Sequence, residues 1–115
     1  MHRTDGQWYS AEYSAFSISD EVGKYQLTVD GYSGDAGNAI ADVQWPPYIS
    51  NGMPFSTPDS DNDNRPSGNC AASHKTGWWQ NWCSSSELNR DVKGRWDTVS
   101  DGANVKASRM LVKLN

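Results

Sequence analysis

Apolar and polar side chains alternate along three stretches of the chain, and this period of two is typical of short β-strands. In residues 8–18 the alternation places apolar side chains on both faces of the expected strand. A turn or short helical step at 20–23 separates this strand from a second one over 25–29, and a final strand is expected over 110–114. The pattern therefore predicts three short strands.

Regular structure is interrupted between these strands. A short helix is expected over 36–41, and Pro46 and Pro47 then end any regular element because proline lacks a backbone donor. Residues 51–68 form a long polar loop, and loops of this length are usually functional or disordered. The sequence therefore predicts a loop-rich α+β domain.

The composition is poor in aliphatic side chains and rich in aromatic ones, with six Trp and five Tyr among 115 residues. A core of this kind depends on the burial of aromatic rings and needs a further source of stability, such as a disulfide or a bound metal. The net charge of −4, with no basic cluster, argues against binding to nucleic acid or to anionic lipid. No apolar run approaches the ~20 residues that cross a bilayer, so no membrane span is expected.

The two cysteines, Cys70 and Cys83, both lie in polar, turn-rich sequence. That setting disfavours a buried free thiol and favours one disulfide, which would place the protein in an oxidising compartment. Two alternatives stay open from the residues alone: reduced cysteines in a cytosolic protein, or a zinc site that includes His74. The zinc site is the weaker of these because the short-spaced Cys pairs of structural zinc sites are missing.

Asp59, Asp61 and Asp63 place a carboxylate at every second position of the long loop. Alternate side chains of a tight loop can converge, and hard oxygen ligands suit Ca²⁺, whereas Mg²⁺ demands a stricter octahedral geometry. The loop is not an EF-hand, because Asn64 stands where Gly is needed and Cys70 where Glu is needed. The alternative to a calcium site is a solvated turn, since Asp and Asn favour turns in any case.

No catalytic set is recognisable in the sequence. There is no Ser-His-Asp grouping and no reactive Cys-His pair with a buried base. A carboxylate pair for glycoside hydrolysis could be drawn from the acidic loop, but such acids need contrasting environments, which this loop does not provide. A binding module is therefore expected, not an enzyme.

An ordered series of motifs resembles one family. From Asn51 the chain reads NGMPFSTPDSDNDNRPSGNCAASHKTGWWQNWCSSSELN, which is similar to the fibrinogen-related domains of fibrinogen chains, ficolins, tachylectin-type lectins, angiopoietins and tenascins. Upstream, AEYSAFSISDE, KYQLTV and GYSGDAGNAI also resemble that family, so the match runs over most of residues 8–90. The resemblance implies a partial fibrinogen C-terminal-like fold: a short antiparallel sheet, a subdomain that carries a calcium loop and a ligand pocket, and one disulfide.

The resemblance sharpens the metal prediction. Family members bind one Ca²⁺ through two Asp side chains and two backbone carbonyls, which here implies the ligand set Asp61, Asp63, Arg65 and Ser67. Asp59 matches an acidic position that is usually not a ligand. The family also pairs the two cysteines that match those of this chain, which supports a Cys70–Cys83 disulfide.

The ligand pocket of the lectin members lies beside that disulfide. By resemblance its residues here are His74, Trp82, Cys83, Ser84, Val99 and Ser100. The family also implies a cis peptide between Trp82 and Cys83, which would turn a backbone N–H towards the pocket. The aromatic and His side chains that enclose an acetyl group in lectin members are replaced here by Ser84, Val99 and Ser100. The resemblance therefore implies that this pocket lacks the walls needed to bind an acetyl group.

The family domain is about twice this length, so residues 1–115 resemble its C-terminal part, with the sheet in 1–50 and the calcium loop and pocket in 51–115. A half-domain exposes strand edges and apolar surface, so we expect another copy or a partner chain to cover that face. The implied function is a secreted, calcium-dependent, lectin-like module for glycans, acetylated or anionic groups, in innate defence. The alternative is a protein-interaction or assembly module of the matrix or fibrinogen type.

Overall fold

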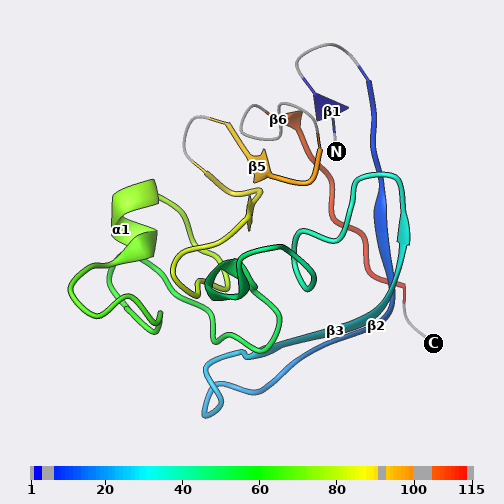
Figure 1. The fold of residues 1–115 in the computed structure, drawn as a ribbon. Helices are drawn as coiled ribbons and strands as arrows, with labels where there is room; N and C mark the ends of the chain where they lie inside the picture. The colour runs from blue at the N-terminus through cyan, green and yellow to red at the C-terminus, as the bar shows by residue number, and fades with distance from the viewer. Residues whose placement is uncertain (1, 4–6, 91–92, 100–104, 114–115) are drawn as a thin grey trace.

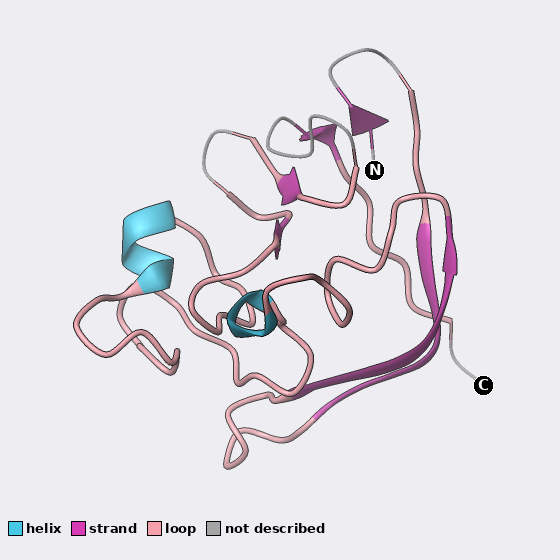
Figure 2. Ribbon diagram, viewed as in Figure 1, coloured by secondary structure: helices cyan, strands magenta, loops and turns pink. Residues whose placement is uncertain are grey.

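The computed structural model describes residues 2–3, 7–90, 93–99 and 105–113 of the 115-residue chain. Most of this chain is loop, with short elements distributed along it (Figures 1 and 2). These elements are β1 (His2–Arg3), β2 (Ala11–Ile18), β3 (Leu27–Gly34), η1 (Pro46–Tyr48), α1 (Cys70–His74), β4 (Ser86–Glu87), β5 (Arg95–Trp96) and β6 (Val105–Ala107). The strands pair antiparallel as β1–β6, β2–β3 and β4–β5, which confirms the loop-rich α+β prediction.

The longest pairing is the β2–β3 hairpin, whose register runs from Ile18 opposite Leu27 to Ala11 opposite Gly34. The sequence predicted these strands at 8–18 and 25–29, so the end of β2 at Ile18 is confirmed, whereas the start of β2 and both ends of β3 differ. Tyr25 is not part of β3, because it has a φ of 55° and lies in the turn. Its carbonyl accepts a hydrogen bond of 2.9 Å from the indole of Trp79, so a distant contact fixes where the strand begins.

The core-facing side of this hairpin is covered only in part. Phe16 and Ile18 lie directly opposite Val29 and Leu27, so these four side chains project from the same face. Leu27 and Val29 are buried, whereas Phe16 and Ile18 are 43% and 48% exposed. Tyr13, which has the other parity, also packs against the core, so apolar side chains lie on both faces, as the alternation predicted.

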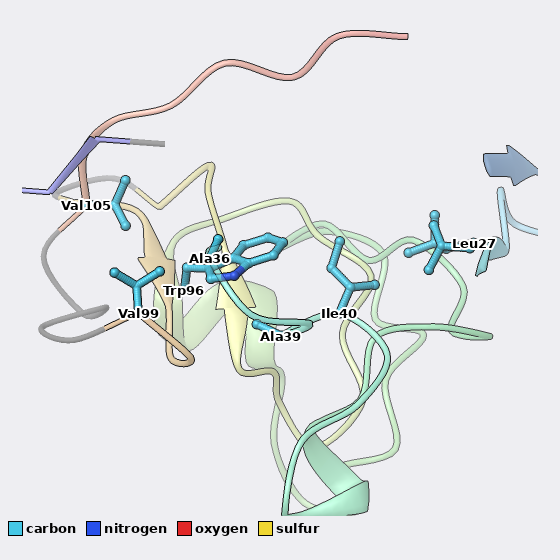
Figure 3. Packing of buried hydrophobic residues seen from close by; sticks show 8 residues of the cluster. Leu27, Ala36, Ala39, Ile40, Trp96, Val99 and Val105 are labelled. Carbon is cyan, nitrogen blue, oxygen red and sulfur yellow. The ribbon is translucent and has the colours of Figure 1, made fainter. Parts of the chain in front are cut away.

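The core is small and draws on segments far apart in the sequence (Figure 3). Its buried members are Leu27, Val29, Ala36, Ala39, Ile40, Trp96, Val99 and Val105. The indole of Trp96 donates a hydrogen bond of 2.9 Å to the Gly37 carbonyl, which ties β5 to the segment after the hairpin. A second aromatic group, Phe55–Trp79–Trp78, has successive ring centroids 5.2 Å apart.

The predicted helix over 36–41 is wrong. The segment makes only a turn, in which the Asp42 N–H donates to the Asn38 carbonyl at 2.9 Å. Gly37 has a φ of 84°, a left-handed value that interrupts a right-handed helix. Its carbonyl is also held by Trp96 from outside the segment, so tertiary contacts decide the local conformation.

Two further predictions need correction. Pro46 and Pro47 do not end regular structure but begin the 3-10 helix η1, where the missing proline N–H costs little. The final strand lies at Val105–Ala107 and not at 110–114, because residues 110–113 find no partner strand among the described residues. Leu114 lies outside the described residues. The long polar loop over 51–68 is confirmed, since no helix or named strand interrupts it.

Candidate functional site

A disulfide forms the covalent centre of the candidate site. Cys70 and Cys83 are bonded, with Cα atoms 5.5 Å apart, which confirms the predicted pairing. Cys70 is the first residue of α1, and the side chain of Asn69 caps this helix by accepting the Ala72 N–H at 2.9 Å. The disulfide therefore joins the end of the acidic loop to the segment that follows Trp82.

The acidic loop is ordered by its own carboxylates. Both oxygens of Asp63 accept backbone N–H groups, from Arg65 at 2.9 Å and from Cys70 at 2.8 Å. Asp61 accepts the Asp63 N–H at 3.2 Å through one oxygen. The Thr57 hydroxyl donates to Asp59 at 2.6 Å and holds the pKa of that carboxyl below its ordinary value. These bonds give the loop a defined course.

The donor atoms of this loop fit a calcium ion better than a transition metal. The carboxylates of Asp61 and Asp63 keep lone pairs beyond those used for backbone N–H groups, and the Arg65 and Ser67 carbonyls lie in the same loop. Among the described residues, no three Asp, Glu, His or Cys side chains gather as a metal site. A hard cation here would therefore rely on two carboxylates, backbone carbonyls and water, which is a donor set that Ca²⁺ accepts.

A hollow of about 220 Å³ lies beside the disulfide. Its lining residues are Tyr48, Arg65, His74, Trp82, Cys83, Ser84 and Arg95. Four residues predicted for the ligand pocket, His74, Trp82, Cys83 and Ser84, are thus brought together. The Ser84 hydroxyl is already engaged, because it donates to the Ser86 carbonyl at 2.8 Å and contacts the Ser50 hydroxyl at 2.6 Å.

Two of the predicted pocket features differ from the structure. Val99 is only 5% exposed and packs in the hydrophobic core, so its side chain is unavailable to the hollow. The Trp82–Cys83 peptide is trans, as are all the other described peptide bonds, in keeping with the ~3–4 kcal/mol cost of a cis bond before a non-proline residue. Ser100 lies outside the described residues, so its predicted role stays a prediction.

Sequence reasoning missed three side chains of the hollow. Tyr48 comes from η1 and Arg95 from β5, while Arg65 was predicted only for its carbonyl. Arg95 donates to Asp97 at 2.7 and 2.8 Å, and these bonds raise the pKa of its guanidinium. No local motif marks these positions, because only the fold brings them to the disulfide.

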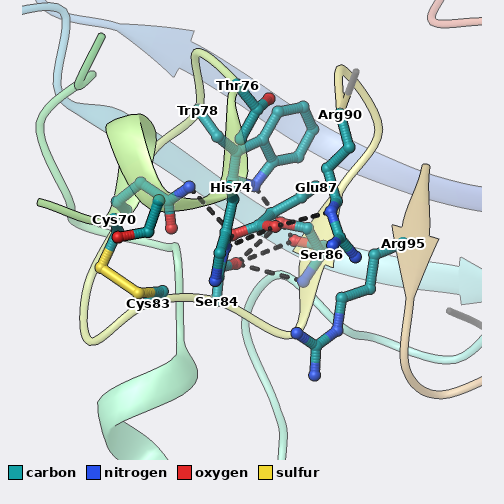
Figure 4. A network of polar contacts seen from close by, with 12 residues as sticks. Cys70, His74, Thr76, Trp78, Cys83, Ser84, Ser86, Glu87, Arg90 and Arg95 are labelled. Atoms are coloured by element: carbon teal, nitrogen blue, oxygen red, sulfur yellow. Dashed lines mark hydrogen bonds and ion pairs between the residues drawn. A yellow bond between two sulfur atoms is a disulfide. The ribbon is translucent and has the colours of Figure 1, made fainter. Parts of the chain in front are cut away.

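A buried polar network adjoins the hollow through His74 (Figure 4). Glu87 is fully buried, and its carboxylate contacts His74 Nδ1 at 2.7 and 3.0 Å. The Gln80 amide donates to the same carboxylate at 2.9 Å, and Arg90 Nε lies 3.6 Å from it. The indole N–H of Trp78 donates to the Ser86 hydroxyl at 3.3 Å. The network thereby connects the hollow to the aromatic group of Phe55, Trp79 and Trp78.

With this fold and site in view, comparison with known proteins places the chain in a family. Residues 1–107 match the family described as fibrinogen beta and gamma chains, C-terminal globular domain, and the chain belongs to it. Fibrinogen-like protein 1 of Rattus norvegicus is 44% identical over 85 residues, covering 69% of this chain and 26% of that protein. Fibroleukin of Homo sapiens is 32% identical over 123 residues, covering 90% of this chain and 27% of that protein.

Solved structures agree with this assignment. The fibrinogen-like globe domain of human ANGPTL6 superposes with a TM-score of 0.74 at 32% identity, covering 90% of this chain and 49% of that one. A lamprey fibrin D-dimer, complexed with the peptide ligand Gly-His-Arg-Pro-amide, gives a TM-score of 0.76 at 26% identity and covers 90% of this chain and 40% of that one. The chain thus spans about half of a globe domain and 26% to 27% of the full-length relatives above. No helix among the described residues has the length and hydropathy needed to cross a membrane.

Proposed function

We propose that the chain is an extracellular recognition module that binds a protein or peptide partner at the hollow beside the disulfide, and that its acidic loop holds Ca²⁺. The observation that carries this proposal is the hollow itself, in which aromatic and charged side chains from η1, α1 and β5 meet the disulfide. The lamprey relative was solved with a peptide ligand, which supports a peptide-binding role for the fold. The disulfide and the family support an extracellular setting.

The lining of the hollow favours protein recognition over catalysis. Trp, Tyr and Arg are the side chains that most often dominate the binding energy of protein interfaces. Trp82 is 48% exposed and Tyr48 36% exposed, so both are available to a partner. A lectin-like ligand is the second candidate, because the same two aromatic rings offer faces for a sugar ring to pack against.

The partly uncovered face of the β2–β3 hairpin supports a further contact. Phe16 and Ile18 remain exposed, and related globe domains extend to about twice the length of this chain. We propose that a second copy or a partner chain covers this face, as expected from the sequence. Sedimentation as a well-behaved monomer at tens of micromolar would argue against this contact.

Binding at the hollow can be tested with Trp82→Ala. We expect peptides selected from a displayed random library by the wild-type protein to bind the variant about 30-fold more weakly, since truncating a central interface Trp costs ~2 kcal/mol or more. Titration calorimetry on purified peptides measures the loss. Trp8→Ala is the matched control, because Trp8 is similarly exposed at 58% but does not line the hollow.

A glycan array screened in parallel separates the two candidates. Specific glycan hits that are lost in Trp82→Ala, with no selected peptide, would favour the lectin-like function. Peptides that bind both Trp variants equally well would remove the hollow from the proposal.

Calcium binding by the acidic loop should appear as stabilisation. At a free Ca²⁺ concentration 100 times its dissociation constant, we expect the free energy of unfolding to rise by about 2.7 kcal/mol. Asp61→Asn should abolish this rise, because it removes a predicted ligand charge from an exposed position. Asp59→Asn should leave it unchanged, which controls for the loss of one negative charge in the same loop. Thermal unfolding with Ca²⁺ and with chelator measures both, and a wild type that ignores millimolar Ca²⁺ would refute the site.

A further inference from the structure

The charges around the hollow point to a particular class of ligand. We infer that the hollow selects a carboxylate-bearing, acidic segment of a polypeptide partner, an inference that rests on the proposed peptide-binding function. Three basic side chains, Arg65, His74 and Arg95, line the hollow, and no Asp or Glu is among its lining residues in the described part of the chain. The whole protein carries a net charge of −4, so this basic lining contrasts with the rest of the molecule.

The three basic groups come from separate parts of the fold and are not equivalent. Arg65, in the acidic loop, makes a contact of 3.4 Å with the Ser73 hydroxyl and no ion pair among the described residues. Arg95, on β5, donates two hydrogen bonds to the carboxylate of Asp97, and this negative charge offsets part of the Arg95 charge. A guanidinium has five N–H donors in all, so Arg95 keeps donors for a ligand. Arg65 therefore supplies the least compensated charge.

His74 is oriented by a residue that the ligand does not meet. Its Nδ1 contacts the buried carboxylate of Glu87, while 26% of the His74 side chain stays exposed. Nε2 is therefore the ring nitrogen left for a ligand. Figure 4 shows His74 between Glu87 and the disulfide, with Arg95 on the other side of the network.

Glu87 is held in place by residues outside the hollow, which makes it a positioning residue. The Gln80 amide donates to its carboxylate at 2.9 Å and Arg90 Nε lies 3.6 Å from it, and neither residue lines the hollow. Both Gln80 and Glu87 are fully buried, so this arrangement is a fixed part of the fold and not a mobile surface contact. The ligand thus meets the basic side of the His74–Glu87 pair, and the acidic side remains inside the protein.

The aromatic residues explain why the proposed occupant is a peptide segment and not a small anion. Tyr48 and Trp82 flank the basic groups, and exposed aromatic rings next to arginines bind neighbouring apolar or backbone atoms of a polypeptide. A free anion would engage the basic groups alone. An acidic side chain with its flanking residues uses both halves of the lining.

The test is an array of immobilised peptides in matched triplets, identical except that an Asp in the first is Asn in the second and Lys in the third. We expect the wild-type protein to retain the Asp member of a triplet at least tenfold more strongly than the other two. Arg65→Gln and His74→Gln should each reduce that binding about tenfold. Arg109→Gln is the control for net charge, because Arg109 is exposed in the C-terminal segment and does not line the hollow.

Glu87→Gln separates positioning from simple electrostatics by the sign of its effect. Removing a nearby negative charge would strengthen binding of the Asp peptides if charge alone mattered. Loss of the His74 orientation should weaken it severalfold, with a changed ¹⁵N spectrum of the His74 ring and an intact disulfide. Tighter binding to Glu87→Gln would overturn the positioning role.

The remaining outcomes distinguish this inference from the function on which it rests. Equal or preferential binding of the Asn or Lys peptides, with loss in Trp82→Ala, would overturn the acidic preference but keep peptide recognition at the hollow. Binding of heparin that Arg65→Gln abolishes, with no peptide retained, would assign the basic lining to a sulfated glycan instead. No binding by any triplet or selected peptide would refute peptide recognition as a whole.

Discussion

Replacing Trp78 with alanine is expected to lower the free energy of unfolding by about 3–5 kcal/mol, as for other large-to-small changes at fully buried aromatic residues. Trp78 is 0% exposed and packs edge-on against Trp79 with ring centroids 5.2 Å apart. Its indole N–H donates to the Ser86 hydroxyl at 3.3 Å, so truncation also leaves that buried hydroxyl without its donor. Its backbone pairs with Ser56, which ties it to the long polar loop over 51–68.

Urea unfolding, followed by Trp fluorescence and far-ultraviolet circular dichroism, measures this loss. Trp78→Phe should cost less, and it keeps a folded reference if the alanine variant does not fold. Trp45→Ala is the matched control: Trp45 is 59% exposed, so we expect a change within about 0.5 kcal/mol. Equal effects of the Trp78 and Trp45 substitutions would show that the aromatic group is not a second core.

The parts of the fold that could be predicted from the sequence are those with a local signal. The β2–β3 hairpin follows from alternation, because a period of two reports directly on a strand. The boundaries failed where distant groups intervene: the Trp79 indole holds the Tyr25 carbonyl, and the Trp96 indole holds that of Gly37. The alternation of apolar and polar side chains over 110–114 was misleading. A strand also needs a second strand to form hydrogen bonds with, and the alternation does not show whether one is present.

The residues of the candidate site also fall into those that the sequence predicted and those that it did not. His74, Trp82, Cys83 and Ser84 lie near one another in the sequence and within the motifs that resemble the family, so their convergence was predicted. Tyr48 and Arg95 reach the hollow through the pairing of β4 with β5 and through the contacts of η1, which no local motif encodes. The Pro47 carbonyl accepts the Trp82 N–H at 2.8 Å, and the Tyr48 carbonyl accepts the Ser85 N–H at 3.2 Å. Those long-range bonds seat Tyr48 against the hollow.

Val99 shows how the family resemblance misled the site prediction. Its position next to a turn fits a pocket wall in the family pattern, but an aliphatic side chain gains more by joining a core that is short of aliphatic residues. Trp96 and Val105 lie in that core with it, and the three come from the C-terminal third of the chain. Because aliphatic side chains are scarce, the fold also depends on aromatic rings and on the Cys70–Cys83 disulfide for its stability.

Loss of the Cys70–Cys83 disulfide is expected to be the second large effect. A sequence separation of 13 residues corresponds to about 3 kcal/mol of stabilisation in the chain-entropy model, which is a large share of the stability of a small domain. The double variant Cys70→Ala/Cys83→Ala should therefore unfold at markedly lower urea concentration than the wild type. A reducing agent should shift the wild type to the same midpoint and leave the double variant unchanged, which controls for unrelated effects of the reductant.

The disulfide also determines how the two halves of the site are joined, so its loss should affect binding beyond stability. Asp63 accepts the Cys70 N–H from the acidic loop, and His74 lies at the other end of the same short helix. Without the bond to Cys83, α1 is no longer fixed against the wall of the hollow. Where Ca²⁺ changes the affinity of the wild type for a peptide, we expect the folded double variant, at urea concentrations below its unfolding midpoint, to bind that peptide equally well with and without Ca²⁺. Calorimetric titration of a selected peptide, with and without Ca²⁺, measures this coupling. Unchanged coupling in a folded double variant would mean that α1 is held by its packing, through buried Ala71 and the cap at Asn69, and that the disulfide serves stability alone.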